Sequence, residues 1–212
     1  MILTFIAFTI ATLANLTSPL VPVNPRVLGQ SQFSLEKRYA NAWVNDVFKD
    51  NILLTLGRMD SSIDQSKTIS WQEVTKPRSF SVTLNPGELF ASHEDVLDQY
   101  KGKPIKTMKS HFNYSDGFKS SGYLYGDGIC HLASLLYRAA KNAGLDAYAP
   151  TNHDFAAIPE IPREFGVSIY FSPNQKEASE RQNLYITNTK DKPIQFVFDN
   201  DGANLSVRII EH

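Results

Sequence analysis

The sequence predicts an α+β fold in which a mostly antiparallel sheet packs against one helix, with a helical segment near the N-terminus. Two observations predict it. A stretch that begins at Cys130 repeats leucine and alanine with helical spacing and stops at Gly144, a typical helix-ending residue. Beyond Gly144 the chain changes to short apolar runs typical of strands, and the last two flank residues 199–202, a hairpin turn signal.

The same patterns assign the remaining elements in chain order. We expect a linker over 19–32, a helix from Ser34 to Trp43, and a second helix over 45–59, for which a strand over 51–56 is the alternative. After a polar loop over 60–70 come a strand over 79–84, a turn over 85–87, a short helix with Ser92 and Asp95 as its capping box, and a long loop over 101–121. The expected strands after Gly144 are 146–149, 167–171, 183–188, 194–198 and 205–210, with an exposed loop over 172–182.

The first 25 residues carry no charge and are moderately apolar, which favours a signal peptide or a short membrane anchor over 1–18. A buried N-terminal helix is the alternative. We therefore divide the 212 residues into a signal or anchor with its linker (1–32), an N-terminal helical segment (33–76) and a catalytic domain (77–212). The expected location is outside the cytoplasm, at the cell surface or anchored in the membrane.

Charge and cysteine content narrow the class of protein. The net charge is −1 and no long basic run occurs, so we expect no nucleic-acid partner. No pattern calls for a cofactor. The chain has one cysteine, which rules out an internal disulfide and leaves a buried free thiol, an intermolecular bridge or a reactive group.

That cysteine follows Gly126, Asp127 and Gly128 and sits where a helix should begin. The glycines permit positive φ and the close approach of another group. Unpaired N–H groups and the helix dipole favour a thiolate at this position, so Cys130 is the candidate nucleophile. The N–H groups of the 126–130 loop and the helix start are the candidate oxyanion donors.

His153 follows the helix by one expected return strand, which would bring it back toward the helix start as a general base. A surface histidine is the alternative reading. Asp154, Glu164 and Asp199 are candidates to orient the imidazole. Cys130 could also join the histidines at 111, 131 and 153 in a zinc site, but no spacing matches a known template, so we expect no metal.

From about residue 80 to 210 the chain resembles the VanW family, named after an accessory protein of vancomycin-resistance clusters. The resemblance rests on Pro86-Gly87-Glu88 with Phe90, on Gly126, Gly128, Ile129, Cys130, Leu136 and Tyr137, on His153, and on Asn183-Leu184 with Asn188. His131 stands where the family has glutamine. The resemblance implies an L,D-transpeptidase activity on peptidoglycan peptides, with Cys130 as nucleophile, His153 as base and Glu164 near the family's acidic position. His131, Tyr123 and Tyr125 are the expected substrate contacts.

Three functions follow as hypotheses. The first is a cell-envelope cysteine acyltransferase that acts on peptidoglycan stem peptides. The second is a cysteine peptidase or amidase resembling transglutaminase-like domains. The third is a non-catalytic wall-binding module in which Cys130 is a small buried side chain.

Overall fold

The computed structural model describes residues 26–65, 68–122 and 125–211, and these form two four-stranded sheets with helices between them. The larger sheet has the order β1-β8-β7-β2 and is antiparallel throughout. Its strands are β1 (Arg26–Ser34), β2 (Arg78–Leu84), β7 (Ile194–Asn200) and β8 (Asn204–Glu211). The predicted strand at 79–84 and the predicted hairpin across 199–202 are confirmed.

The smaller sheet has the order β4-β3-β6-β5. Its strands are β3 (Leu89–Ala91), β4 (Ile105–Thr107), β5 (Asp146–Tyr148) and β6 (Tyr185–Thr187). Only the β3–β4 pair is parallel among the described strands, so the prediction of an α+β fold with mostly antiparallel strands is confirmed.

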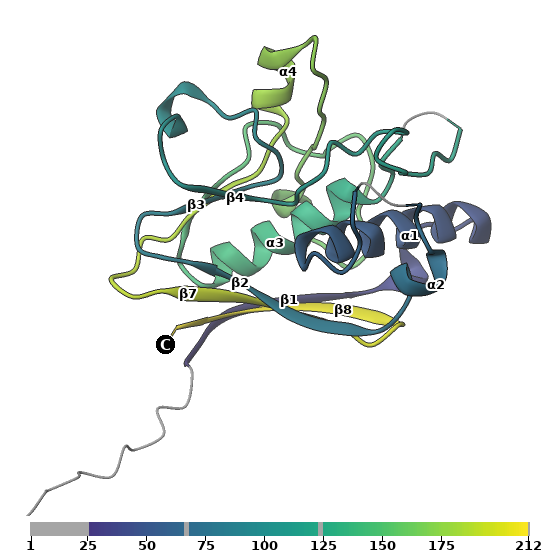
Figure 1. Cartoon of the computed structure of the whole chain (residues 1–212). Helices are drawn as coiled ribbons and strands as arrows, with labels where there is room; N and C mark the ends of the chain where they lie inside the picture. Colours follow the sequence, from purple (N-terminus) through teal and green to yellow (C-terminus); the bar gives the residue numbers. More distant parts are fainter. Residues whose placement is uncertain (1–25, 66–67, 123–124, 212) are drawn as a thin grey trace, which may run out of the picture.

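The helices are α1 (Ala42–Met59), α2 (Trp71–Val74), α3 (Ile129–Asn142) and α4 (Lys176–Arg181). In Figure 1, α1 and α3 lie on one face of the larger sheet, and β3 and β4 lie beyond α3. The side chain of Asn41 caps α1 by accepting the N–H of Val44. The stretch over 51–56 is therefore helical, and the strand alternative is wrong.

β1 occupies most of the stretch expected to be a linker, so that prediction is wrong from Arg26 onward. The strand pairs with β8, and the C-terminal end of α3 packs against it. A Cβ atom on Gly29 would lie 2.4 Å from the backbone nitrogen of Ala143. Only glycine allows the helix to approach the strand this closely.

Five further local predictions need correction. The helix predicted from Ser34 to Trp43 is absent, because Ser34 ends β1, a 3-10 turn covers Leu35–Lys37 and α1 begins at Ala42. The short helix opened by Ser92 is absent, and a 3-10 turn over Asp98–Tyr100 replaces it. The long loop contains β4, and the exposed loop over 172–182 contains α4. Residues 167–171 are not a strand, because their N–H groups bond to side chains and to a loop carbonyl: Val167 to Ser134 Oγ, Ser168 to the Thr151 carbonyl and Ile169 to Cys130 Sγ.

Two buried asparagines join the ends of the smaller sheet to its loops. Asn183 accepts the N–H groups of Ser92 and Leu184 and donates to the carbonyls of His93 and Asp95. Asn188 donates to the carbonyls of Leu84 and Lys192, and its backbone bonds both ways with the turn at 87–88. The asparagine positions of the resemblance therefore have a structural role, since they satisfy buried backbone groups.

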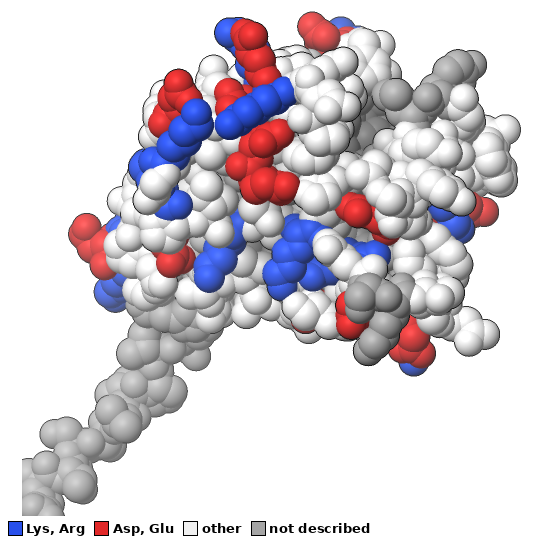
Figure 2. All heavy atoms as spheres, turned by 45° about the horizontal axis from the view of Figure 1, so that its top comes forward, with Lys and Arg blue, Asp and Glu red and all other residues white. Residues whose placement is uncertain are grey.

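No helix in the described part of the chain is long and apolar enough to cross a membrane. The predicted signal or anchor at 1–18 lies outside the described residues. On the face seen in Figure 2, acidic and basic side chains are interspersed.

Candidate active site

Cys130 is the second residue of α3, and its thiol faces the backbone of Ile169. Sγ lies 3.4 Å from the Ile169 nitrogen, which donates to it, and 3.8 Å from the Ile169 carbonyl oxygen. Ser134, one turn later, donates to the Cys130 carbonyl and accepts the N–H of Val167. The segment over 167–169 is thus fixed against the start of α3 by polar contacts.

The loop before α3 has the conformation that its glycines predict. Gly126 and Gly128 have φ values of 79° and 97°. A Cβ atom on Gly128 would lie 2.6 Å from the carbonyl oxygen of Phe48, so α1 presses directly on this loop. Asp127 holds the loop from within, because its carboxylate accepts the N–H of Ser121 at 2.7 Å.

The Cys130 thiol does not have the lowered pKa that the helix dipole suggested. Part of the residue is accessible to solvent, but the sulfur is enclosed, and this burial raises the pKa of Cys130 to about 11. Hydrogen bonds from the N–H groups of Ile169 and of Cys130 itself lower the pKa, and the charge of Asp127 raises it further. The resting thiol is neutral at pH 7, because desolvation outweighs the dipole.

His153 is buried on a loop and contacts the residue next to the cysteine. Its Nδ1 lies 3.1 Å from the Ala156 carbonyl oxygen, and its ring centre lies 6.1 Å from that of His131. Because a carbonyl only accepts, Nδ1 carries the proton and Nε2 holds the lone pair. Burial lowers the pKa of His153, so the ring is neutral at pH 7.

Cys130 and His153 share neighbours, but no hydrogen bond joins them among the described residues. Successive N–H groups of the 167–169 segment point to opposite sides, Ile169 toward Cys130 and Ser168 toward the Thr151 carbonyl. This segment therefore lies between the start of α3 and the beginning of the histidine loop. A direct proton transfer between the two side chains would require one of them to move.

His131 lies between α1 and the histidine loop. It is 5 % exposed, its ring packs edge-on against Phe48 at 5.0 Å, and its Nδ1 has no hydrogen-bond partner in the described structure. Burial, followed by the charges of Arg38 and His153, lowers its pKa to about 3. These contacts give His131 a structural position beneath the surface.

Among the described residues, none of the three candidate orienting acids forms a hydrogen bond with a ring nitrogen of His153. Glu164 is exposed in a 3-10 turn over Arg163–Phe165. Asp199 is on β7, where it accepts from Ser79 and pairs with Arg208. Asp154 is exposed, and its charge raises the pKa of His153. The Ala156 carbonyl orients the imidazole instead.

A cavity of about 210 Å³ opens beside the start of α3. Ile129, which precedes Cys130 in the sequence, and Ile169, whose backbone contacts the thiol, both line it. The other lining residues are His111, Phe112, Asn113, Tyr125, Gly126, Tyr170 and Phe171. Cys130 itself is not one of the residues that line this cavity. Of the predicted substrate contacts, Tyr125 is half exposed and reaches the cavity, whereas Tyr123 lies outside the described residues.

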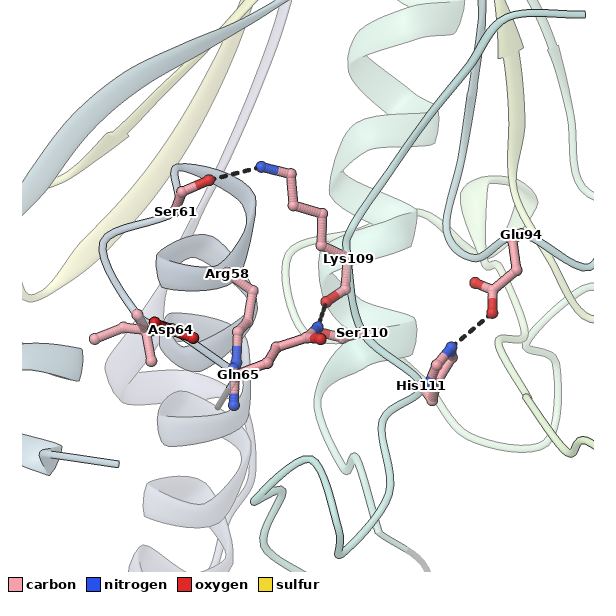
Figure 3. A pocket seen from close by; sticks show the side chains of 9 residues that line it. Arg58, Ser61, Asp64, Gln65, Glu94, Lys109, Ser110 and His111 are labelled. Carbon is pink, nitrogen blue, oxygen red and sulfur yellow. Dashed lines mark hydrogen bonds and ion pairs between the residues drawn. The ribbon is translucent and has the colours of Figure 1, made fainter. Parts of the chain in front are cut away.

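His111 is the cavity residue that the sequence did not single out as a catalytic candidate. Its Nε2 lies 2.6 Å from a carboxylate oxygen of Glu94, its Nδ1 lies 3.7 Å from Asp116, and its ring stacks on Phe171. Figure 3 shows the pair with Glu94 at the edge of a second cavity of about 590 Å³. No sequence signal marks this pair, because Glu94 and His111 come from separate loops.

Arg58 lies at the floor of that second cavity and is 3 % exposed. One guanidinium nitrogen donates to the Asp116 carbonyl, while Nε and Nη1 have no hydrogen-bond partner in the described part of the chain. Burial lowers the pKa of Arg58, and the charges of Asp116 and Asp64 oppose that shift. Among the described residues, no group of three or more His, Cys, Asp or Glu side chains could hold a metal ion.

Comparison with known proteins identifies the family. The family model described as "VanW like protein" matches residues 73–210, which is more than half of the chain. Neither the curated proteins nor the solved structures contain a match. This family relates the protein to the cell wall and to vancomycin resistance. The match covers both sheets except β1, together with the cysteine loop and His153, and the chain therefore belongs to the VanW-like family.

Proposed function

We propose that this protein is an exported cell-envelope cysteine acyltransferase that acts on peptidoglycan stem peptides, of the L,D-transpeptidase type. One observation carries the proposal. The only cysteine of the sequence is at the N-terminus of an α-helix, and its neighbours Ile129 and Ile169 line a cavity of about 210 Å³. Helix N-termini and their unpaired N–H groups stabilise negative charge that develops during a reaction.

The reaction would proceed in two balanced steps. Sγ of Cys130 attacks a peptide carbonyl, its proton passes to Nε2 of His153, and the C–N bond breaks as the leaving amine takes that proton. A second amine then attacks the thioester, and the C–S bond breaks to regenerate the thiol. In the first turn of α3 the N–H groups of Ile129 and Leu132 already donate to the carbonyls of Gly126 and Gly128, so the N–H groups of Cys130 and His131 would hold the oxyanion of each tetrahedral intermediate.

The choice of base follows from the hydrogen bonds of the two histidines. His153 is neutral and keeps a lone pair on Nε2, so it can accept a proton. The Nε2 of His111 is already engaged by the carboxylate of Glu94 at 2.6 Å, so we assign the base to His153 instead. Because the thiol is neutral at rest, proton transfer would accompany the attack instead of preceding it. Displacement of the 167–169 segment by the substrate would bring the two side chains together.

A non-catalytic wall-binding module is the second candidate, and one observation favours it. The Cys130 sulfur is enclosed and its pKa is about 11, as in an inert structural cysteine. The two functions differ in a simple measurement: at neutral pH an inert thiol resists alkylation even when peptidoglycan fragments are present, whereas a nucleophile becomes reactive as the substrate opens the site. A cysteine peptidase or amidase would react like the transferase but release free acids.

Intact-mass spectrometry of the full chain with muropeptides tests the proposal. We expect an acyl adduct on the wild type that is absent from Cys130→Ala and slow to form on His153→Ala. His111→Ala is the matched control for loss of a histidine near the cavity, and it should still form the adduct. Products then separate the enzyme classes, since cross-linked peptides indicate transfer and free acids indicate hydrolysis. Absence of any adduct on the wild type, with the thiol still unreactive, would leave the wall-binding module.

A further inference from the structure

A wide groove lined by aromatic residues lies next to the candidate active site. It has a volume of about 900 Å³ and runs between the N-terminal half of α1, α2, the 114–120 segment and Tyr125. Three of its rings are unusually exposed for their size: Trp43 is 60 % exposed, Tyr114 is 74 % and Tyr125 is 50 %. Exposed aromatic side chains that gather in one groove mark a binding surface more often than a random patch does.

The polar residues of the groove exclude some classes of ligand. Lys119 is its one cation among the described lining residues, and that charge is already engaged, since it pairs with Asp50 and lies 3.9 Å above the Trp71 ring. Asp46 adds a second acidic side chain. Nucleic acids need unpaired positive charge next to stacking rings, so this lining does not suit them.

The same lining fits a ligand that is flat, uncharged and polar at its edges. A pyranose ring has one face of C–H groups that stacks on an aromatic ring, and hydroxyl groups around its rim that bond to carboxylates and hydroxyls. The exposed rings of Trp43, Tyr114 and Tyr125 supply the faces, because Lys119 already covers the Trp71 ring. The carboxylate of Asp46 and the hydroxyl of Ser120 supply an acceptor and a donor, whereas Asp50 is already paired with Lys119. Tyr114 and Tyr125 lie 5.6 Å apart, close enough to contact one sugar together.

We infer that this groove binds the glycan strand of the cell wall. Tyr125 lines both the groove and the 210 Å³ cavity beside Cys130, so a glycan in the groove would hold its attached peptide at that cavity. The choice of an amino-sugar glycan rests on the proposed function, because stem peptides are carried by such strands. Binding itself depends only on the groove.

The chain provides its own reporter for the test. The two tryptophans of the sequence, Trp43 and Trp71, both line the groove. Titration of the full chain with β-1,4-linked N-acetylglucosamine oligomers should therefore give a saturable change in tryptophan fluorescence. Tyr114→Ala keeps both reporters and should weaken the apparent affinity about ten-fold, the loss expected for one stacked ring. Trp43→Phe keeps a ring and should bind more tightly than Trp43→Ala.

Controls separate this inference from the proposed enzyme. Tyr148→Ala removes a comparably exposed aromatic from β5, outside the groove lining, and should leave affinity unchanged. Cys130→Ala should bind the oligomers normally, so binding that persists without any acyl adduct would reject the enzyme and keep the groove. An acyl adduct on the wild type without any oligomer binding would keep the enzyme and reject the groove as a glycan site. An apparent affinity of Tyr114→Ala equal to that of the wild type, or saturation by an apolar peptide but not by the oligomers, would overturn the inference.

Discussion

Replacement of Asn183 by alanine tests how much one buried amide, which joins the smaller sheet to its loops, contributes to the free energy of unfolding. The side chain is fully buried and makes four hydrogen bonds to backbone groups, at distances of 2.8–3.2 Å. The change to alanine leaves two N–H groups and two carbonyl groups without partners. At a net value of about 1 kcal/mol for each bond, Asn183→Ala should lower the free energy of unfolding by about 4 kcal/mol.

Equilibrium unfolding in urea, followed by circular dichroism, measures this loss. With an m-value of about 2 kcal/mol per molar urea, the midpoint should fall by about 2 M. Asn174→Ala is the matched control, because that asparagine is exposed, and its free energy of unfolding should stay within about 0.5 kcal/mol of wild type. Asn183→Asp keeps the acceptor but loses both donated bonds, so it should also be destabilised. Equal midpoints for the alanine variants of Asn183 and Asn174 would refute the reasoning.

Three further predictions concern packing and protonation. Gly29→Ala should destabilise the protein by several kcal/mol, because its Cβ would lie 2.4 Å from the Ala143 nitrogen; a melting temperature like that of wild type would contradict this. In Gly128→Ala the residue would keep a φ of 97° and its Cβ would lie 2.6 Å from the Phe48 carbonyl oxygen, so the loop before Cys130 has to shift. Alkylation of Cys130 at high pH should therefore become faster, and an unchanged rate would count against this prediction. For His131 the folded pKa of about 3 lies below the ordinary 6.5, so the unfolded chain binds a proton first as pH falls. Stability should therefore decrease below pH 6.5 by up to about 1.4 kcal/mol per pH unit, and His131→Gln should flatten that slope; an identical slope in the variant would disprove the assignment.

The elements that sequence reasoning found are those with strong periodicity. α3 repeats apolar residues on one face, and the β7–β8 hairpin alternates around its turn. β1 escaped detection because two of its inward positions, Gly29 and Ser31, are small rather than apolar. The contact with α3 demands small residues there, and small residues hide the period-two pattern.

Misleading local signals explain the wrong assignments. Ser92 resembled a helix cap, but its backbone N–H bonds to Asn183, far along the chain. Residues 167–171 alternate like a strand, yet their N–H groups bond to Ser134, Cys130 and Thr151 instead of a neighbouring strand. Tertiary partners decided both cases, and no local pattern encodes them.

The candidate site was predicted in part. The position of Cys130 in α3 and the positive φ of its glycines follow from the sequence. The pKa of the thiol does not, because the enclosure of the sulfur depends on Ile169, thirty-nine residues away. The pair of His111 with Glu94 likewise depends on two loops that only the fold brings together.

The larger sheet includes β1, a strand that lies outside the residues matched by the family model. The match begins at residue 73, but β1 spans Arg26–Ser34 and pairs along nearly the whole of β8. A fragment cut at the start of the match would also lack α1. It would present β8 as a long unprotected edge, the kind of edge that recruits strands from other molecules. Expression that follows the family boundary should therefore yield an aggregating protein, whereas one that retains β1 keeps that edge covered.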